Sequence, residues 1–486
     1  MSSPPTFTPL PQVPVHHLLV FLLQVSSLLA LALLLGALAT RLRLPAVVGE
    51  LAAGVLLGPS VFGHLSARGW QWLFPHAEQQ VHMLDALAQV GVLLLVGLTG
   101  TQLDTGLIRR RGATAVRVSL AGLLVPLGAG IGLGYLLPGQ ILTGAGRATF
   151  AVFLGVAMCV SALPVIAKTL SDMKLDHRDV GQLILVAAMF DDAVGWFLLS
   201  VVSAMAAGRV HAGEVAVTAA LLVAFVLAAL LIGRPLVRSA FRLAGRGEDD
   251  GPTVATAVVV VLCGAAVSPL LGLEPIFGAF VAGVLIGSPG RGATAPTRRL
   301  AALRTFVRWV AAPLFLATAG LRMDLATLAR PTIALTTLAV LVVAMAGKLV
   351  GAFLGGRLSG LSARESWAVG AGLNARGVVE VTIGLVGLRL GVLTSATYTT
   401  IVVVALLTSV VAAPALRVLM SGVDVTAEER LRRTALDSWS PRHESDPPPR
   451  RQSPNGRLLQ GCWHRTAGQR TGHAPDSTRT AGSERD

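Results

Sequence analysis

The sequence has few charged residues and few aromatic side chains. Only 14% of its 486 residues are Asp, Glu, Lys or Arg and 5% are Phe, Trp or Tyr, whereas 53% are hydrophobic. The mean hydropathy is accordingly positive, at +0.69. This composition excludes a soluble globular domain and predicts a polytopic membrane protein.

Cysteines and N-terminal positive charges are also scarce. The three cysteines, Cys159, Cys263 and Cys462, lie far apart, which excludes a disulfide framework and a cysteine metal site. The N-terminal residues MSSPPTFTPLPQVPVHH contain no Lys or Arg and so lack the charged region of a signal peptide. We therefore expect residues 1–16 to be an extracytoplasmic N-terminus, followed by an apolar stretch that remains as an anchor.

Long apolar stretches are what the sequence has in abundance. About thirteen stretches, bounded by charge, Pro or Gly, come close to the roughly 20 residues that a membrane-spanning helix needs. The predicted fold is an all-α domain over residues 17–420 that embeds in the lipid bilayer. The stretches lie near residues 17–38, 44–62, 84–103, 113–137, 148–168, 180–207, 213–233, 253–271, 275–288, 305–321, 331–355, 365–388 and 394–419.

Positive charges alternate between the loops that join these stretches. One set of loops holds most of the Arg and Lys residues, for example at 109–117 and 298–308, while the opposite set holds single arginines such as Arg209 and Arg389. Because positively charged loops stay in the cytoplasm, we expect a cell-membrane protein with its N-terminus outside and its C-terminus in the cytoplasm. The net charge of +14 then reflects topology, and we expect no nucleic-acid partner.

Two pairs of segments resemble each other. Val48–Ser60 and Phe277–Pro289 share the string AGVL followed by an apolar residue and Gly, and Gly100–Arg110 matches Gly320–Arg330. The partners of each pair lie an odd number of predicted spans apart, so they run in opposite directions. This predicts an inverted-topology repeat, as in secondary transporters. Chance similarity between apolar strings is the alternative.

The predicted span at 148–168 contains Ser161 and Pro164 near its middle. Proline removes a helical hydrogen bond, so backbone carbonyls freed there could bind a cation beside the Ser161 hydroxyl. A simple proline kink is the alternative.

The predicted span at 365–388 contains Asn374, Arg376 and Glu380, and we predict that this span is broken as well. Charged side chains there could neutralise the dipoles of half-helices that face each other in the bilayer. Alternatively, Arg376 and Glu380 pair with each other at i,i+4. Either structural role is favoured over direct ion binding.

Asp191 and Asp192 are adjacent and are the only charged residues of the apolar segment 180–208. A carboxylate at the bilayer centre costs at least ~2.5–3.5 kcal/mol. Because two adjacent carboxylates repel, one should hold a proton near neutral pH unless a cation is bound. The pair therefore predicts a site that exchanges protons for cations.

Three other interpretations of the aspartates are weaker. An aspartyl protease needs aspartates that face each other, whereas neighbours on one helix point about 100° apart. A cation channel needs a filter loop or charged ring, and none is visible. A helix–helix hydrogen-bonding role would leave transport unaffected by Asp192→Asn.

Lys348 is the single charged residue in the middle of the span at 331–355. A buried ammonium needs a partner, and the aspartate pair is the obvious candidate; extension of the side chain to the membrane surface is the alternative. If Lys348 pairs with one aspartate in the empty site, cation binding would break that pair and could couple the two fluxes.

Several motifs in order make the chain resemble the monovalent cation:proton antiporter superfamily of sodium/proton exchangers, in its CPA2 branch. They are RLRLPAVVGELAAGVLLGPSVFG, VSALPVIA, FDDAVGW, PLFLATAGLRMDL and GLNARGVVEV. The resemblance covers nearly the whole membrane region, about residues 20–420. The resemblance implies that Asp192 is the main carrier of cation and proton and that Asp191 pairs with Lys348. It further implies electrogenic exchange, a homodimer with a core domain that moves like an elevator, and no cofactor or enzymatic activity.

The sequence departs from the family pattern at two places. Gln102 stands where an acid is usual, although Asp104 remains, and Ser161-Ala162 replaces a more polar pair in the first broken helix. The preferred cation is therefore open, with Na⁺ first and a potassium/proton efflux system as the alternative. Residues 421–486 are polar and without apolar periodicity, which predicts a disordered cytoplasmic tail.

Overall fold

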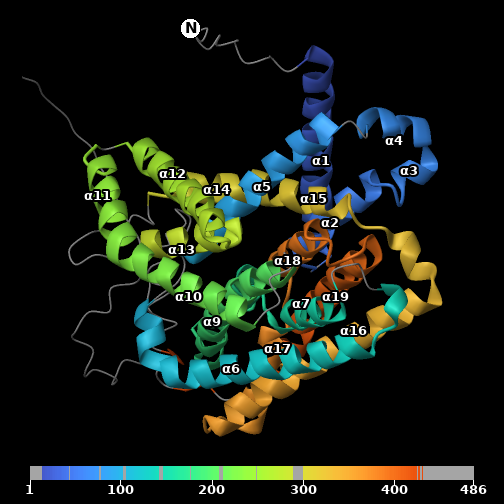
Figure 1. Cartoon of the computed structure of the whole chain (residues 1–486). Helices are drawn as coiled ribbons and strands as arrows, with labels where there is room; N and C mark the ends of the chain where they lie inside the picture. The colour runs from blue at the N-terminus through green and yellow to red at the C-terminus, as the bar shows by residue number, and fades with distance from the viewer. Residues whose placement is uncertain are drawn as a thin grey trace, which may run out of the picture. The chain divides into compact units, whose positions relative to one another are not determined.

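A computed structural model describes residues 14–42, 44–75, 78–101, 105–141, 146–175, 177–206, 212–247, 249–287, 299–423, 425–426 and 429–430. This part of the chain is helical and contains no β-strand, as the sequence predicts (Figure 1). Gln102, Asp104 and the tail from residue 431 onwards lie outside the described residues.

The helices coincide with the predicted apolar stretches. Nine helical stretches among the described residues are long and apolar enough to cross a membrane, and a further pair, α17 and α18, is bent by 49°. The number of spans, predicted to be about thirteen, stays a prediction. The helices are α1 (Val15–Arg41), α2 (Ala46–Leu57), α3 (Phe62–Leu65), α4 (Ala67–Leu73), α5 (Glu78–Gly100), α6 (Thr105–Leu136), α7 (Arg147–Cys159), α8 (Leu163–Asp172), α9 (Asp179–Ala206), α10 (Ala212–Ala228), α11 (Arg234–Ala244), α12 (Gly251–Val267), α13 (Pro275–Gly287), α14 (Ala301–Phe306), α15 (Ala312–Gly320), α16 (Pro331–Leu358), α17 (Ala363–Leu373), α18 (Val378–Arg389) and α19 (Ser395–Met420).

The helices associate into two groups. The first group consists of α1, α2, α5, α12, α13 and α15, and the second of α6 to α9 and α16 to α19. Contacts are dense within each group and sparse between them, where α13 meets α9 and α15 meets α18. The buried polar and charged residues of the predicted site all belong to the second group.

Close helix packing in the first group depends on the glycines of the repeated string. A Cβ atom on Gly54 of α2 would lie 1.9 Å from the carbonyl oxygen of Ala317 in α15, and one on Gly283 of α13 would lie 1.9 Å from that of Gly97 in α5. Small residues allow membrane helices to approach this closely. The equivalent contacts of Gly54 and Gly283 are consistent with the predicted inverted repeat, which itself stays a prediction.

The second group is built on α6 and α16, which run side by side (Figure 1). A Cβ atom on Gly351 of α16 would lie 2.4 Å from the carbonyl oxygen of Ala121, and one on Gly355 would lie 2.7 Å from that of Arg117. Ser119 of α6 and Lys348 of α16 both contact Asp191 of α9. The two closely packed helices therefore present these side chains to the same helix.

Two interrupted helices cross next to α9. The first interruption separates α7 from α8 at Val160–Ala162, so Pro164 is the second residue of α8 and does not kink a continuous helix. At that position the missing N–H of proline costs no hydrogen bond. The second interruption separates α17 from α18, and the N–H of Ala162 donates to the carbonyl of Ala375 across the crossing at 3.1 Å.

Candidate functional site

Asp191 and Asp192 lie on α9 and both have 0% exposed surface. Because successive residues of a helix point about 100° apart, the two carboxylates meet different surroundings. Asp191 is surrounded by hydrogen-bond donors, whereas Asp192 is not.

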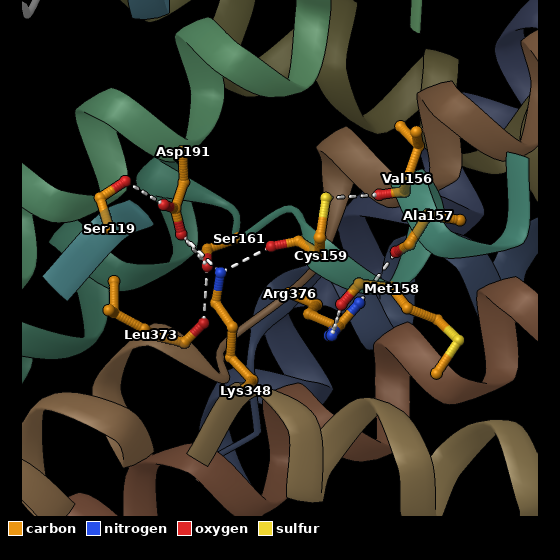
Figure 2. Close-up of polar contacts among 10 residues, drawn as sticks. All are labelled: Ser119, Val156, Ala157, Met158, Cys159, Ser161, Asp191, Lys348, Leu373 and Arg376. Carbon is orange, nitrogen blue, oxygen red and sulfur yellow. Dashed lines mark hydrogen bonds and ion pairs between the residues drawn. The ribbon is translucent and has the colours of Figure 1, made fainter. Parts of the chain in front are cut away.

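Three side chains donate to Asp191. Ser119 Oγ lies 2.7 Å from Oδ1, and Lys348 Nζ lies 2.6 Å from Oδ2. Ser161 Oγ lies 2.8 Å from Oδ2. Figure 2 shows these donors converging on the carboxylate from three separate segments of the chain. Asp191 is therefore a fully satisfied, paired carboxylate.

Lys348 is fully buried and does not reach along α16 to a membrane surface. Its ammonium group pairs with Asp191 and also donates to the carbonyl oxygen of Cys159 at 2.6 Å. Cys159 is the last residue of α7, so the positive charge lies at the negative end of that helix dipole. The ammonium thus compensates both a carboxylate and a helix end.

Ser161 connects the two interrupted helices. Its hydroxyl lies 2.8 Å from Asp191 Oδ2 and 2.7 Å from the carbonyl oxygen of Leu373, the last residue of α17. A hydroxyl has one proton to donate, so the two acceptors compete for it. Ser161 therefore lies between the Asp191 carboxylate and the C-terminal end of α17.

Among the described residues, neither carboxylate oxygen of Asp192 has a hydrogen-bond partner of normal geometry, although both are buried. The backbone N–H of Leu163, at the start of α8, lies beside the carboxylate. An unpaired ionised carboxylate is very unfavourable in a low-dielectric interior. The side chain therefore requires a proton or a cation, whereas Asp191 is already paired with Lys348.

Arg376 and Glu380 both interact with the ends of interrupted helices. The Arg376 guanidinium donates to the carbonyl of Ala157 at 2.9 Å and to that of Met158, in the last turn of α7 (Figure 2). Glu380 Oε2 accepts from the N–H of Gly377, at the start of α18, at 2.7 Å. A cation thus lies at a helix C-terminus and an anion at a helix N-terminus, where each is favourable.

The alternative i,i+4 pair between these two residues is not what the structure contains. Within the described part of the chain, no ion pair joins Arg376 to Glu380. Arg376 lies in the non-helical segment between α17 and α18, so the helical spacing on which that alternative depended does not apply.

Asn374 lies at the C-terminal end of α17 and is 3% exposed. Among the residues that the structure describes, its side-chain oxygen Oδ1 is buried without a hydrogen-bond partner, as is Oε1 of Glu380. The interrupted helices and α9 thus supply several bare, buried oxygen atoms, which are the ligand type that alkali cations use.

Ser119 is the site residue that sequence reasoning missed. It is buried, at 2% exposed, and lies two residues after Arg117, where the apolar part of α6 begins. A serine in a membrane helix often bonds to its own backbone, so the sequence gives no sign that this one faces Asp191. Only the packing of α6 against α9 identifies it.

Known proteins resemble the chain over most of its length. The family described as "Sodium/hydrogen exchanger, transmembrane" matches residues 28–422. Cation/H(+) antiporter 20 of Arabidopsis thaliana is 32% identical over 411 residues, which are 81% of this chain and 47% of the plant protein. The chain thus spans about half the length of the plant relatives that it matches.

Two further similarities extend over nearly the whole of the other protein. The Na(+)/H(+) antiporter NhaS4 of Synechocystis is 29% identical over 403 residues, which are 82% of this chain and 97% of NhaS4. The solved structure of the sodium proton antiporter MjNhaP1 from Methanocaldococcus jannaschii superposes with a TM-score of 0.56 at 16% identity, and the match covers 84% of this chain and 98% of that one. The latter similarity shows a shared fold.

Proposed function

The chain belongs to the sodium/hydrogen exchanger family, and we propose that it exchanges a monovalent cation for protons across the cell membrane, with Asp192 as the carrier. The observation that carries the proposal is the contrast between the aspartates. Asp191 is paired with Lys348, while the fully buried Asp192 has no side-chain donor or ion-pair partner among the described residues. A proton and a cation can each neutralise Asp192, and they exclude one another.

A purely structural role does not account for Asp192. A carboxyl that held helices together would have hydrogen bonds to its neighbours, as Asp191 has to Ser119 and Ser161. Asp192 has none. Its burial is unfavourable for folding, so its presence needs an explanation in function.

Coupling between the two fluxes would pass through Lys348. A cation that binds beside Asp192 lies close to the adjacent Asp191 and competes with the ammonium group for its negative charge. Weakening of the Lys348–Asp191 pair then allows Lys348 to lose a proton. Exchange of unequal charge, which is electrogenic, follows if both Asp192 and Lys348 release protons for one cation.

Alternating access would arise from movement of the second helix group relative to the first. The sparse contacts between the groups support this, because few interactions would have to break. One of them is the hydrogen bond from the Tyr398 hydroxyl to the carbonyl of Ala319, at 2.9 Å. We also propose a homodimer with its N-terminus outside and C-terminus cytoplasmic, on the resemblance and the charge of the loops.

Cation-driven proton flux in proteoliposomes tests the proposal. Na⁺, Li⁺ and K⁺ are added separately to wild type, to Asp192→Asn and to the control Asp85→Asn, whose aspartate is partly exposed and paired with Arg322. We expect flux in wild type and Asp85→Asn and none in Asp192→Asn. The cation that drives flux distinguishes sodium exchange from potassium exchange, and an active Asp192→Asn would refute the assignment.

A further inference from the structure

The site contains one more acid than base. Asp191, Asp192, Lys348, Arg376 and Glu380 are at most 1% exposed. When all five are ionised, three negative charges face two positive ones. Because a net charge is costly in a low-dielectric interior, this group of side chains is neutral only when it holds one further positive charge, supplied by a proton or by a monovalent cation.

Glu380 supplies the third negative charge, and its contacts leave that charge partly available. One oxygen, Oε2, accepts the N–H of Gly377, while Oε1 is buried without a partner. The guanidinium of Arg376 is directed at the carbonyl oxygens of α7 instead of at this carboxylate. Glu380 is therefore capped but not neutralised by a salt bridge among the described residues.

The electric field of Glu380 acts on Asp192. Glu380 and Asp191 are the two anions whose charges bear on Asp192, with Lys348 as the opposing cation. Two contacts place the two carboxyl groups at the same helix end. Gly377, whose N–H donates to Glu380 Oε2, packs against Ala162 and Val165, and the backbone N–H of Leu163, between those two residues, lies beside the Asp192 carboxylate. The charged and titratable groups around Asp192 and Glu380 are Asp191 on α9, Lys348 on α16, Arg376 between α17 and α18, and Cys159 at the end of α7.

We propose that Glu380 is a positioning and affinity-determining residue of the transport site: its negative charge makes the binding of one cation or one proton obligatory. This inference rests on the proposed exchange function. Without that charge, Lys348 and Arg376 would balance the two aspartates, and the site would hold proton and cation more weakly. With it, Asp192 retains either ligand until the other replaces it.

Glu380→Gln separates this role from helix capping. The glutamine has nearly the same shape and keeps an oxygen that can accept from the N–H of Gly377, so the start of α18 remains capped. The variant removes only the charge. Glu380→Asp keeps the charge and is the conservative counterpart.

Glu429→Gln is the matched control. Glu429 is buried and also caps a helix, since its Oε1 accepts from the N–H of Asp179 at the start of α9. Asp179 is about 20 Å along α9 from Asp192 at the usual rise per residue. Both variants lose a capping carboxylate, and Glu429→Gln in addition loses the ion pair with Arg178 at 3.1 Å, so it is the harsher structural change. Only Glu380→Gln changes the charge near Asp192.

Exchange is measured in proteoliposomes against NaCl and KCl concentration from pH 6 to pH 9. In Glu380→Gln we expect the cation KM at alkaline pH to rise by about tenfold or more, and the pH of half-maximal exchange to fall by about one unit, the usual effect of losing a nearby negative charge. Glu429→Gln and Glu380→Asp should both keep the wild-type KM and pH profile.

Three results would decide against the proposal or against its premise. A Glu380→Gln protein with a lower maximal rate but unchanged KM and pH profile would reduce Glu380 to a cap. If Glu380→Gln does not fold, Glu380→Asp still tests the proposal. Because this variant keeps the negative charge, a tenfold rise of its KM would show that the charge does not set the affinity. Absence of exchange in wild type would instead refute the proposed function.

Discussion

Lys348 and Asp191 form an ion pair of 2.6 Å in which neither side chain has any exposed surface. Burial of two charges is costly, and the attraction between them compensates only when further hydrogen bonds satisfy both groups. Ser119, Ser161 and the carbonyl of Cys159 provide those hydrogen bonds. Asp192, the next residue on the helix, is left as the site's uncompensated acid.

The energetics of this pair can be measured with a double-mutant cycle. Lys348→Gln leaves Asp191 as an unpaired buried charge and should destabilise the fold by about 3–5 kcal/mol. Adding Asp191→Asn should recover most of that loss, because no charge then remains unpaired. Thermal unfolding in detergent gives the four stabilities, and additive effects would contradict the pairing. A Lys348→Gln protein with an unchanged pH dependence of transport would refute its role in coupling.

Ser119 is expected to stabilise the ionised form of Asp191. Ser119→Ala removes a hydrogen bond to a charged acceptor and should cost about 1.5–3 kcal/mol. Ser200→Ala is the control, because Ser200 is also buried but donates only to the carbonyl of Trp196 in its own helix. Equal unfolding temperatures for the two variants would show that the hydrogen bond to Asp191 stabilises the fold no more than the one within the helix of Ser200.

Arg376 is expected to matter more for stability than any surface arginine. Arg376→Gln leaves the carbonyls of Ala157 and Met158 without donors, and each unsatisfied group costs about 1–3 kcal/mol. In Arg389→Gln the lost partner is Glu274, but Arg389 is 43% exposed, so solvent screening limits the loss to about 1 kcal/mol or less. Unfolding temperatures that rank the two variants in the opposite order would contradict the assignment.

We expect the stability of the fold to depend on pH through Glu429, which caps the N-terminus of α9. Burial acts to raise the pKa of Glu429, but the N–H groups of Asp179 and Thr426 and the charge of Arg178 lower it below the ordinary value of 4.5. The ionised carboxylate therefore stabilises the fold at pH above about 4.5, and the benefit is lost as the pH falls through the lower folded-state value.

The measurement compares unfolding temperatures of wild type and Glu429→Gln from pH 7 down to pH 3.5. We expect wild type to be more stable at neutral pH and the difference to shrink toward the acidic end. A difference that is constant with pH would mean that the glutamate charge does not contribute.

Much of the site could be predicted from sequence, because a charged side chain in an apolar helix must either pair with an opposite charge or extend to the membrane surface. Lys348 and the two aspartates are the only charged residues in the middle of their helices, so their proximity followed from the cost of burying each one alone. Ser119 could not be predicted, since a serine can satisfy itself within its own helix and leaves no charge to balance.

The partners of Arg376 could not be predicted from the sequence, for a different reason. Sequence spacing places Arg376 and Glu380 four residues apart, which suits a pair on a continuous helix. The pairing depends on where the helix begins, and boundaries are the least certain feature of a sequence prediction. Because α18 begins at Val378, after Arg376, the guanidinium is free to reach α7 across the crossing.

The most direct test of Asp192 as the exchanging group is a count of the protons that cation binding releases. Titration calorimetry of the purified protein with NaCl and KCl, in two buffers of different ionisation enthalpy, gives that number. We predict proton release in wild type and in Asp85→Asn, and neither cation binding nor proton release in Asp192→Asn. An Asp192→Asn protein that binds the cation and releases protons as wild type does would contradict the account.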